Sequence, residues 1–217
     1  KAMDVATPMV KIGAEVLAGE ATQRWFIATQ NLAEARGVGG IIGAYAIITV
    51  KDGKVKLSES GSDAKLNGMG ALRSRDFPEG LAELWGVDLN VWQDINASAN
   101  APYAAKLVAD GWKQYTGESL DGVIFVGQGT VRHLVAASGQ IKVRDNVLDS
   151  NNIVDFLSKT IYAKYPDVAT KNAVVTDVMK VLFTHLTNRP INTSAFFASL
   201  ANETTGDRSE ERRVGKE

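Results

Sequence analysis

A polar, glycine-bearing stretch between two apolar runs constrains this chain more than any other feature. Residues 24–28 are short, apolar and aromatic, and residues 41–50 are apolar and rich in β-branched side chains, so both runs predict buried strands. Residues 30–40 between them hold one acid (Glu34), one arginine (Arg36) and three glycines. The pattern predicts a strand, a glycine loop and a second strand, and a loop held between core strands is a common place for a functional site.

The chemistry of this predicted loop indicates an anion site. Glycines let backbone N–H groups approach an anion closely, and a guanidinium can bind phosphate or carboxylate through two parallel hydrogen bonds. Arg36, Gly39 and Gly40 are therefore candidate ligand-binding residues. The alternative is that the glycines only make a crossover turn and that Arg36 is solvated. The local sequence leaves both interpretations open.

The composition excludes several classes of function. The 217 residues are 45% hydrophobic, enough for a globular core. A formal net charge of −1 gives no overall attraction to nucleic acid. The chain has no cysteine, which excludes disulfides and thiolate metal sites, and its two histidines, His133 and His185, lack the spacing of a zinc site. No apolar run reaches the roughly 18 residues of a membrane span.

Strands and helices alternate along the rest of the chain. Asp52-Gly53 between two apolar runs predicts a tight hairpin, and residues 58–70 are rich in Ser, Gly, Asn and Asp and predict a loop. The later predicted elements are helices at 78–85 and 102–116, a strand at 121–126, a helix at 130–137, a strand at 141–143, and helices from Asp149 or Ser150 to 164, from Thr170 to 187 and from 194 to 201. This order predicts an α/β fold: a sheet of about five or more strands covered by helices as an α/β/α sandwich, with a helix-rich C-terminal part.

The domain organisation follows from the two ends. Residues 9–19 have the pattern of a weakly amphipathic helix, so residues 1–20 are expected to be the end of an upstream helical region. Residues 21–206 are expected to form a single α/β domain that is truncated at its C-terminus. Residues 207–217 are charge-rich and look like a translated sequencing adapter, so we expect them to be a non-native tail.

More arginines and carboxylates follow the predicted hairpin. Arg73, Arg75 and Asp76 crowd one turn, and Asp94 lies in a later polar segment. If these loops meet Arg36 at one edge of the sheet, the arginines would bind a doubly charged phosphate and the two aspartates would hold Mg²⁺. The alternative is that each arginine is an ordinary surface residue.

An ordered series of motifs carries a resemblance to a known family. The series is Gln30-Asn31, Glu34, Arg36-Gly37, Gly39-Gly40, Gly43-Ala44-Tyr45, Asp52-Gly53, Asp94, Asn96, Pro102, Ala104-Ala105, Asp121-Gly122-Val123-Ile124, Gly139 and Asn151-Asn152-Ile153-Val154. It resembles the domain of unknown function 4012, found mainly in actinobacterial and other envelope-associated proteins, usually behind an N-terminal membrane helix. The resemblance implies an extracytoplasmic protein, membrane-anchored at full length, whose only link to the membrane is an N-terminal anchor missing from this sequence.

The order of elements is also similar to that of the LytR-CpsA-Psr proteins. Those proteins transfer glycopolymers from polyprenyl-pyrophosphate carriers to peptidoglycan, with arginines and aspartates around a pyrophosphate and Mg²⁺. The similarity implies a Mg²⁺-dependent phosphotransferase acting on a lipid-linked glycopolymer. The implied residues are Arg36, Asp76 and Asp94 for catalysis, Arg36, Gly39, Gly40, Arg73, Arg75 and Asn96 for the ligand, and Asp76 and Asp94 for the metal.

A second interpretation stays open beside this one. Residues 29–31 (Thr-Gln-Asn) end the first strand without the acid of the LytR-type pattern, and residues 127–129 (Gly-Gln-Gly) follow the later strand where the first family commonly has an acid and a proline. A non-catalytic envelope-binding or scaffolding domain that retains the anion site fits the same residues.

Overall fold

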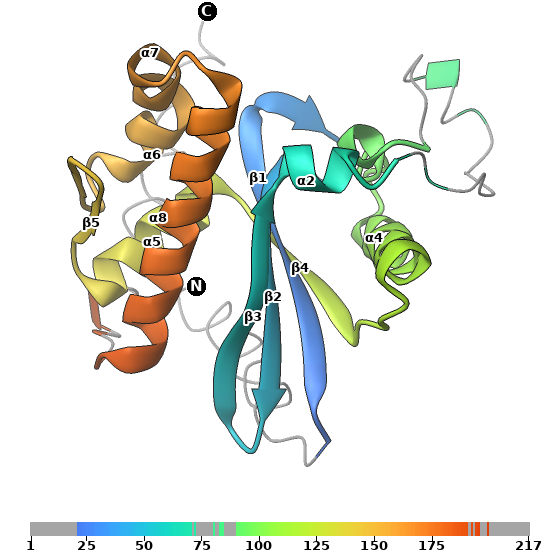
Figure 1. The fold of residues 1–217 in the computed structure, drawn as a ribbon, viewed down its shortest axis with the longest axis horizontal. Coiled ribbons are helices and arrows are strands. Elements are labelled where there is room, and N and C mark those ends of the chain that lie inside the picture. Colours follow the sequence, from blue (N-terminus) through green and yellow to red (C-terminus); the bar gives the residue numbers. More distant parts are fainter. Residues whose placement is uncertain are drawn as a thin grey trace, which may run out of the picture.

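The computed structural model describes residues 21–70, 72, 80, 83–84, 90–190, 192, 194–195 and 199. Figure 1 shows a central sheet with helices on both sides. The elements are β1 (Gln23–Arg36), β2 (Gly39–Lys51), β3 (Lys54–Ser62), α2 (Asp63–Asn67), the 3₁₀-helix η1 (Trp92–Asp94), α4 (Ala101–Thr116), β4 (Gly122–Val126), α5 (Gln128–Ser138), β5 (Ile141–Val143), β6 (Asn146–Leu148), α6 (Ile153–Asp155), the π-helix η2 (Phe156–Thr160), α7 (Ile161–Lys164) and α8 (Val168–Asn188).

The main sheet has the strand order β3-β2-β1-β4. β1 pairs antiparallel with β2 and parallel with β4, and β5 and β6 form a separate two-stranded sheet. Helices α4 and α2 lie on one face of the main sheet and helices α5 to α8 on the other (Figure 1). The predicted α/β class is confirmed, with the described strands divided between these two sheets.

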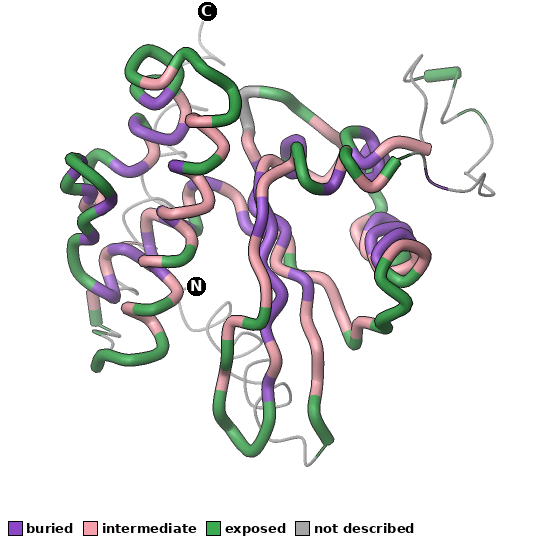
Figure 2. The backbone as a smooth tube through the Cα atoms, viewed as in Figure 1, coloured by how far each residue is buried: buried purple, intermediate pink, exposed green. Residues whose placement is uncertain are grey.

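Two hydrophobic cores fill the spaces between the sheet and its helices. Successive residues of β1 pack alternately into one core and the other, because side chains alternate between the two faces of a strand. Phe26 and Ala28 pack toward α2, η1 and α4, whereas Ile27 packs toward α5 and α8. In the first core the rings of Phe26, Tyr45 and Trp112 lie 5.3 to 5.7 Å apart, centroid to centroid. The buried residues follow the sheet and the inner faces of the helices (Figure 2).

The predicted glycine loop over residues 30–40 is wrong. β1 continues to Arg36 and β2 begins at Gly39, so the turn consists of Gly37 and Val38 alone. The pairing of β1 with β2 shifts register after Thr29 and again between Asn31 and Ala35. These irregularities let a polar stretch stay in the sheet, because a bulge takes extra residues without ending the ladder.

The other local predictions fared unevenly. The hairpin is confirmed, with positive φ at Asp52 (49°) and Gly53 (71°). Helix α4 is confirmed, with Asn100 as N-cap and left-handed Gly117 after its end. The loop predicted at residues 58–70 is wrong, because β3 runs on to Ser62 beside β2 and α2 follows directly.

Helix α8 begins earlier than predicted. Asp167, not Thr170, is its N-cap, and its Oδ2 accepts a hydrogen bond of 2.7 Å from the backbone N–H of Thr170. The helix predicted to end at residue 164 is present, with the π-helical turn η2 inside it. The predicted helices at 9–19, 78–85 and 194–201 lie wholly or mostly outside the described residues. Among the described helices, none combines the length and apolarity needed to cross a membrane.

Candidate functional site

Arg36 and Asp94, both predicted site residues, meet in the structure. Nε of Arg36 lies 2.9 Å from Oδ1 of Asp94, and the two side chains are only 16% and 11% exposed. The same guanidinium donates to the backbone carbonyls of Gln93 and Ala35. The pair therefore ties the end of β1 to η1, and the charge of Arg36 is balanced within the protein.

The neighbouring glycines and Asn96 complete a packed junction. Nδ2 of Asn96, a fully buried residue, donates a 2.8 Å hydrogen bond to the carbonyl of Gly40. A Cβ on Gly37 would lie 2.2 Å from the carbonyl oxygen of Ala97, so only glycine fits there. Gly39 has φ of +114° and packs on the side chain of Gln30. The predicted anion loop is thus a close backbone contact between the β1–β2 turn and residues 93–99.

The remaining predicted residues do not extend this junction in the described part of the chain. Arg73, Arg75 and Asp76 lie outside the described residues. Asp94 is the one described member of the predicted Mg²⁺ pair, and its Oδ1 already accepts from Arg36. Among the described residues, no group of three or more His, Asp or Glu side chains is arranged to hold a metal ion. Because only one of the two predicted ligands lies among the described residues, the Mg²⁺ site stays a prediction.

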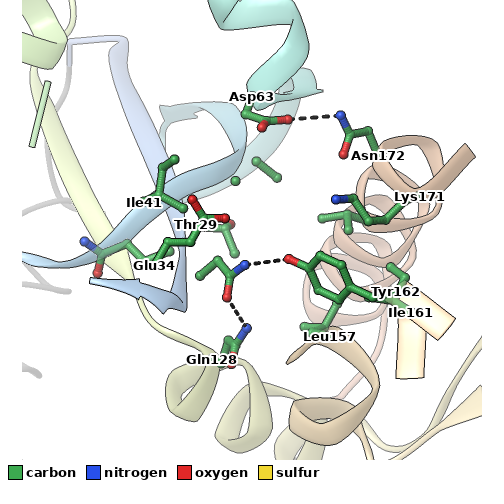
Figure 3. A pocket seen from close by; sticks show the side chains of 15 residues that line it. Thr29, Glu34, Ile41, Asp63, Gln128, Leu157, Ile161, Tyr162, Lys171 and Asn172 are labelled. Atoms are coloured by element: carbon green, nitrogen blue, oxygen red, sulfur yellow. Dashed lines mark hydrogen bonds between the residues drawn. The ribbon is translucent and has the colours of Figure 1, made fainter. Parts of the chain in front are cut away.

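A polar cavity of about 90 Å³ lies on the other side of β1, between the sheet and helices α5 to α8. It sits where β1 leaves β4, at the carboxyl end of the segment over which the two parallel strands pair, and the carboxyl ends of parallel strands are the usual place for a ligand in α/β sheets. Its lining combines amide, hydroxyl and charged side chains with an apolar floor (Figure 3): Thr29, Gln30, Asn31, Glu34, Ile41, Gly43, Ala44, Asp63, Gln128, Leu157, Ile161, Tyr162, Lys171, Asn172 and Val175.

Hydrogen bonds fix the amides around this cavity. Nδ2 of Asn31 donates to the hydroxyl of Tyr162 at 2.8 Å, and Oδ1 of Asn31 accepts from Nε2 of Gln128 at 3.3 Å. On the opposite side Asn172 donates to Oδ1 of Asp63 at 3.1 Å (Figure 3). The cavity is therefore preorganised by contacts between β1, α2 and the helices.

Three charged groups line the cavity: Glu34 from β1, Asp63 from α2 and Lys171 from α8. Burial raises the pKa of Asp63, as does the negative charge of Glu34, while the backbone N–H of Ala64 and the charge of Lys171 act in the opposite direction. Nζ of Lys171 stands 4.4 Å from the centroid of the Tyr162 ring. A half-buried carboxylate with a raised pKa in a cavity is typical of a functional site.

Sequence reasoning reached only half of this cavity. Gln30, Asn31 and Glu34 belong to the motif series, but in that stretch the sequence favours Arg36 as the ligand-binding residue, because a guanidinium is the stronger anion ligand. Asp63 lies in the stretch 58–70, which the sequence predicts as a loop, and no motif marks it there. Tyr162, Lys171 and Asn172 lie on helices, and no local signal marks which polar residues of a helix face a cavity. Thr29, Gln30, Asn31 and Gln128, which lie at the two places where the sequence departs from the patterns it resembles, all contribute to the lining.

The fold and site define an α/β/α domain with a polar cavity at the carboxyl ends of a parallel strand pair. Residues 20–162 match the family described as "Protein of unknown function (DUF4012)", and the chain belongs to this family. A search of the curated proteins finds no match.

We expect Asp63→Asn to stabilise the protein at neutral pH. A carboxyl whose pKa is raised by folding favours the native state when protonated and loses that contribution as pH rises through the folded pKa. The difference in melting temperature between Asp63→Asn and the wild type should therefore grow from acid to neutral pH.

Asp145→Asn is the opposite control for this measurement. Hydrogen bonds from Lys164 and Tyr165 lower the pKa of Asp145, so its contribution is present above its ordinary pKa and is lost in acid. That variant should be less stable than the wild type at neutral pH and equal to it in acid. A pH-independent difference for Asp63→Asn would contradict the role of burial.

Proposed function

We propose that this chain is an extracytoplasmic cell-envelope domain that binds the glycan of an envelope glycopolymer in the cavity beside β1. The observation that supports this is the cavity lining, in which amides, hydroxyls and carboxylates converge over an apolar floor. Such groups match a sugar, whose hydroxyls donate and accept hydrogen bonds while its C–H groups contact apolar side chains. The resemblance to envelope-associated proteins supports the location.

The size of the cavity limits what enters it. An engineered cavity of about 150 Å³ holds one benzene molecule, and this cavity measures about 90 Å³. It therefore suits one substituent of a sugar ring and not a whole ring. The remainder of a polymer would lie outside the opening, as expected for a domain that holds a long glycan by one group at a time.

Cosedimentation with purified cell walls tests this function. The wild-type chain should be retained by cell walls, and Asn31→Leu should reduce the retained fraction about tenfold, because it removes the contacts to Tyr162 and Gln128 and places an apolar group in the cavity. Asn151→Ala, on an exposed turn, is the matched control and should bind like the wild type. Circular dichroism verifies folding. Equal retention of Asn31→Leu, or no retention of the wild type, would refute the proposal.

A phosphotransferase-like activity on polyprenyl-pyrophosphate-linked glycopolymers is the second candidate. It is favoured by the contact between Arg36 and Asp94, because the LytR-CpsA-Psr similarity assigns these residues to the pyrophosphate and the metal. To bind pyrophosphate, Arg36 would have to exchange its bond to Asp94 for one to the ligand. This candidate requires turnover of a polyprenyl-pyrophosphate-linked oligosaccharide in the presence of Mg²⁺. A folded protein without such turnover would have the binding function alone.

A further inference from the structure

The charges of the cavity are not matched within the protein. Glu34 and Asp63 contribute two carboxylates and Lys171 one ammonium, a formal charge of −1. Among the described residues, no ion pair within 4.0 Å joins Lys171 to either carboxylate. Lys171 instead stands over the ring of Tyr162. Asp63 is half-buried and Glu34 is exposed at the edge of the cavity. An excess negative charge at this place favours a cationic ligand group.

The hydrogen bonds of the cavity point the same way. The side-chain amides of Asn31, Gln128 and Asn172 each donate within the protein. Oδ1 of Asp63 accepts hydrogen bonds from the backbone N–H of Ala64 and from Asn172. In the part of the chain described here, no side chain donates a hydrogen bond to Oδ2 of Asp63 or to the carboxylate of Glu34.

Thr29 adds a buried acceptor to the same cavity. It lines the space while only 7% exposed. Its hydroxyl donates a weak 3.7 Å bond to Sδ of Met179, and its oxygen accepts no hydrogen bond from the described residues. The carboxylates of Glu34 and Asp63 and the hydroxyl oxygen of Thr29 therefore offer acceptors to a donor-rich ligand group inside the cavity.

We propose that the cavity binds the ammonium group of an amine-bearing ligand, either an amino sugar or the amine-terminated side chain of a peptide, between Glu34 and Asp63. An ammonium carries three donors, no acceptor and one positive charge, which complements this lining. One ammonium with its carbon also suits a cavity of about 90 Å³. A phosphate carries only acceptors and would face two carboxylates. The inference rests on the proposed function, because it names the ligand group for the same cavity.

Three sugars with one ring and three charges test the proposal. Glucose, glucosamine and glucose 6-phosphate are titrated into the isotope-labelled full chain, and the side-chain amide signals of Asn31 and Asn172 are followed by NMR. Glucosamine should bind at least about tenfold more tightly than glucose, and glucose 6-phosphate more weakly than both. Butylammonium, which has the amine without the ring, is titrated in parallel to separate a peptide source from a sugar source.

Two variants test whether the charge of the cavity, and not its shape, determines the affinity for glucosamine. Asp63→Asn should weaken the binding of glucosamine about tenfold and leave the binding of glucose nearly unchanged. Lys171→Met keeps most of the aliphatic stem and removes a charge of the same sign as the ammonium. It should therefore strengthen the binding of glucosamine about threefold, whereas the binding of an anionic ligand would be lost. Lys180→Met, outside this cavity, is the control and should change neither.

The outcomes distinguish this inference from the glycan proposal. Equal affinities for the three sugars would overturn the ammonium proposal and would still agree with glycan binding. Tightest binding of glucose 6-phosphate, or loss of glucosamine binding in Lys171→Met, would also overturn it. If butylammonium binds and glucosamine does not, the ammonium proposal is supported and the glycan proposal is contradicted. No shift with any probe would overturn both.

Discussion

Arg36→Met is expected to lower the free energy of unfolding by about 3 kcal/mol, because it leaves a nearly buried carboxylate without its counter-charge. Asp94 is 11% exposed in its side chain and lies 2.9 Å from Nε of Arg36. Methionine fills a similar volume but supplies no donor to Asp94 or to the carbonyls of Gln93 and Ala35. Urea unfolding followed by circular dichroism measures the change.

A double variant tests whether the charge is the cause. Arg36→Met/Asp94→Leu should recover most of the lost stability, since replacing both members of a buried pair by apolar groups is often neutral. Arg24→Met is the surface control: its partner Glu118 and Arg24 itself are 45% and 35% exposed, and the loss should stay below about 1 kcal/mol. A fully stable Arg36→Met protein that has lost lipid-pyrophosphate turnover would instead assign Arg36 to catalysis.

The second large effect is expected from Gly37→Ala. An added Cβ would lie 2.2 Å from the carbonyl oxygen of Ala97 and within 2.5 Å of backbone atoms of Ser98 and Ala99. Backbone atoms cannot turn aside as a flexible side chain can, so the β1–β2 turn must separate from residues 97–99. We expect a loss of about 3 kcal/mol in the free energy of unfolding, at the upper end of the cost of overpacking.

Gly127→Ala is the matched control for this experiment. Gly127 has an ordinary φ of −76°, and nothing lies within 4 Å of a Cβ built there. Its substitution should change the stability by less than about 0.5 kcal/mol. Equal effects of the two alanine variants would show that the turn does not pack on residues 97–99 as the structure has it.

Much of the fold could be predicted because it depends on local signals. The Asp52-Gly53 hairpin, the helix from residue 101 to Gly117 and the apolar strand at 122–126 all carry turn, cap or hydrophobic patterns that act within a few residues. The errors have a common cause. Residues 30–36 and 58–62 are polar and look like loops, yet both stretches are strands, because pairing with β2 satisfies their backbone groups.

The candidate site was predicted less completely. The motif series contained Gln30, Asn31 and Glu34, which line the cavity, and Arg36, Asp94 and Asn96, which form the junction beyond it. From the sequence these residues form one set. Neighbours in a strand point to opposite faces, and a bulge changes which face each residue reaches. The division of the set into a packed junction and a cavity therefore depends on register, which the sequence does not display.

The sequence by itself determined the α/β class, the family and the stretch around Gln30 to Gly40 as the place to search, because these follow from hydrophobic patterning and an ordered motif series. Only the tertiary structure decided that Arg36 is neutralised by Asp94 and that Asp63, Tyr162 and Lys171 close a cavity with Asn31. Charge balance and burial depend on groups that lie up to 140 positions apart, from Asn31 to Lys171, and only the packing of helices on the sheet brings such groups together.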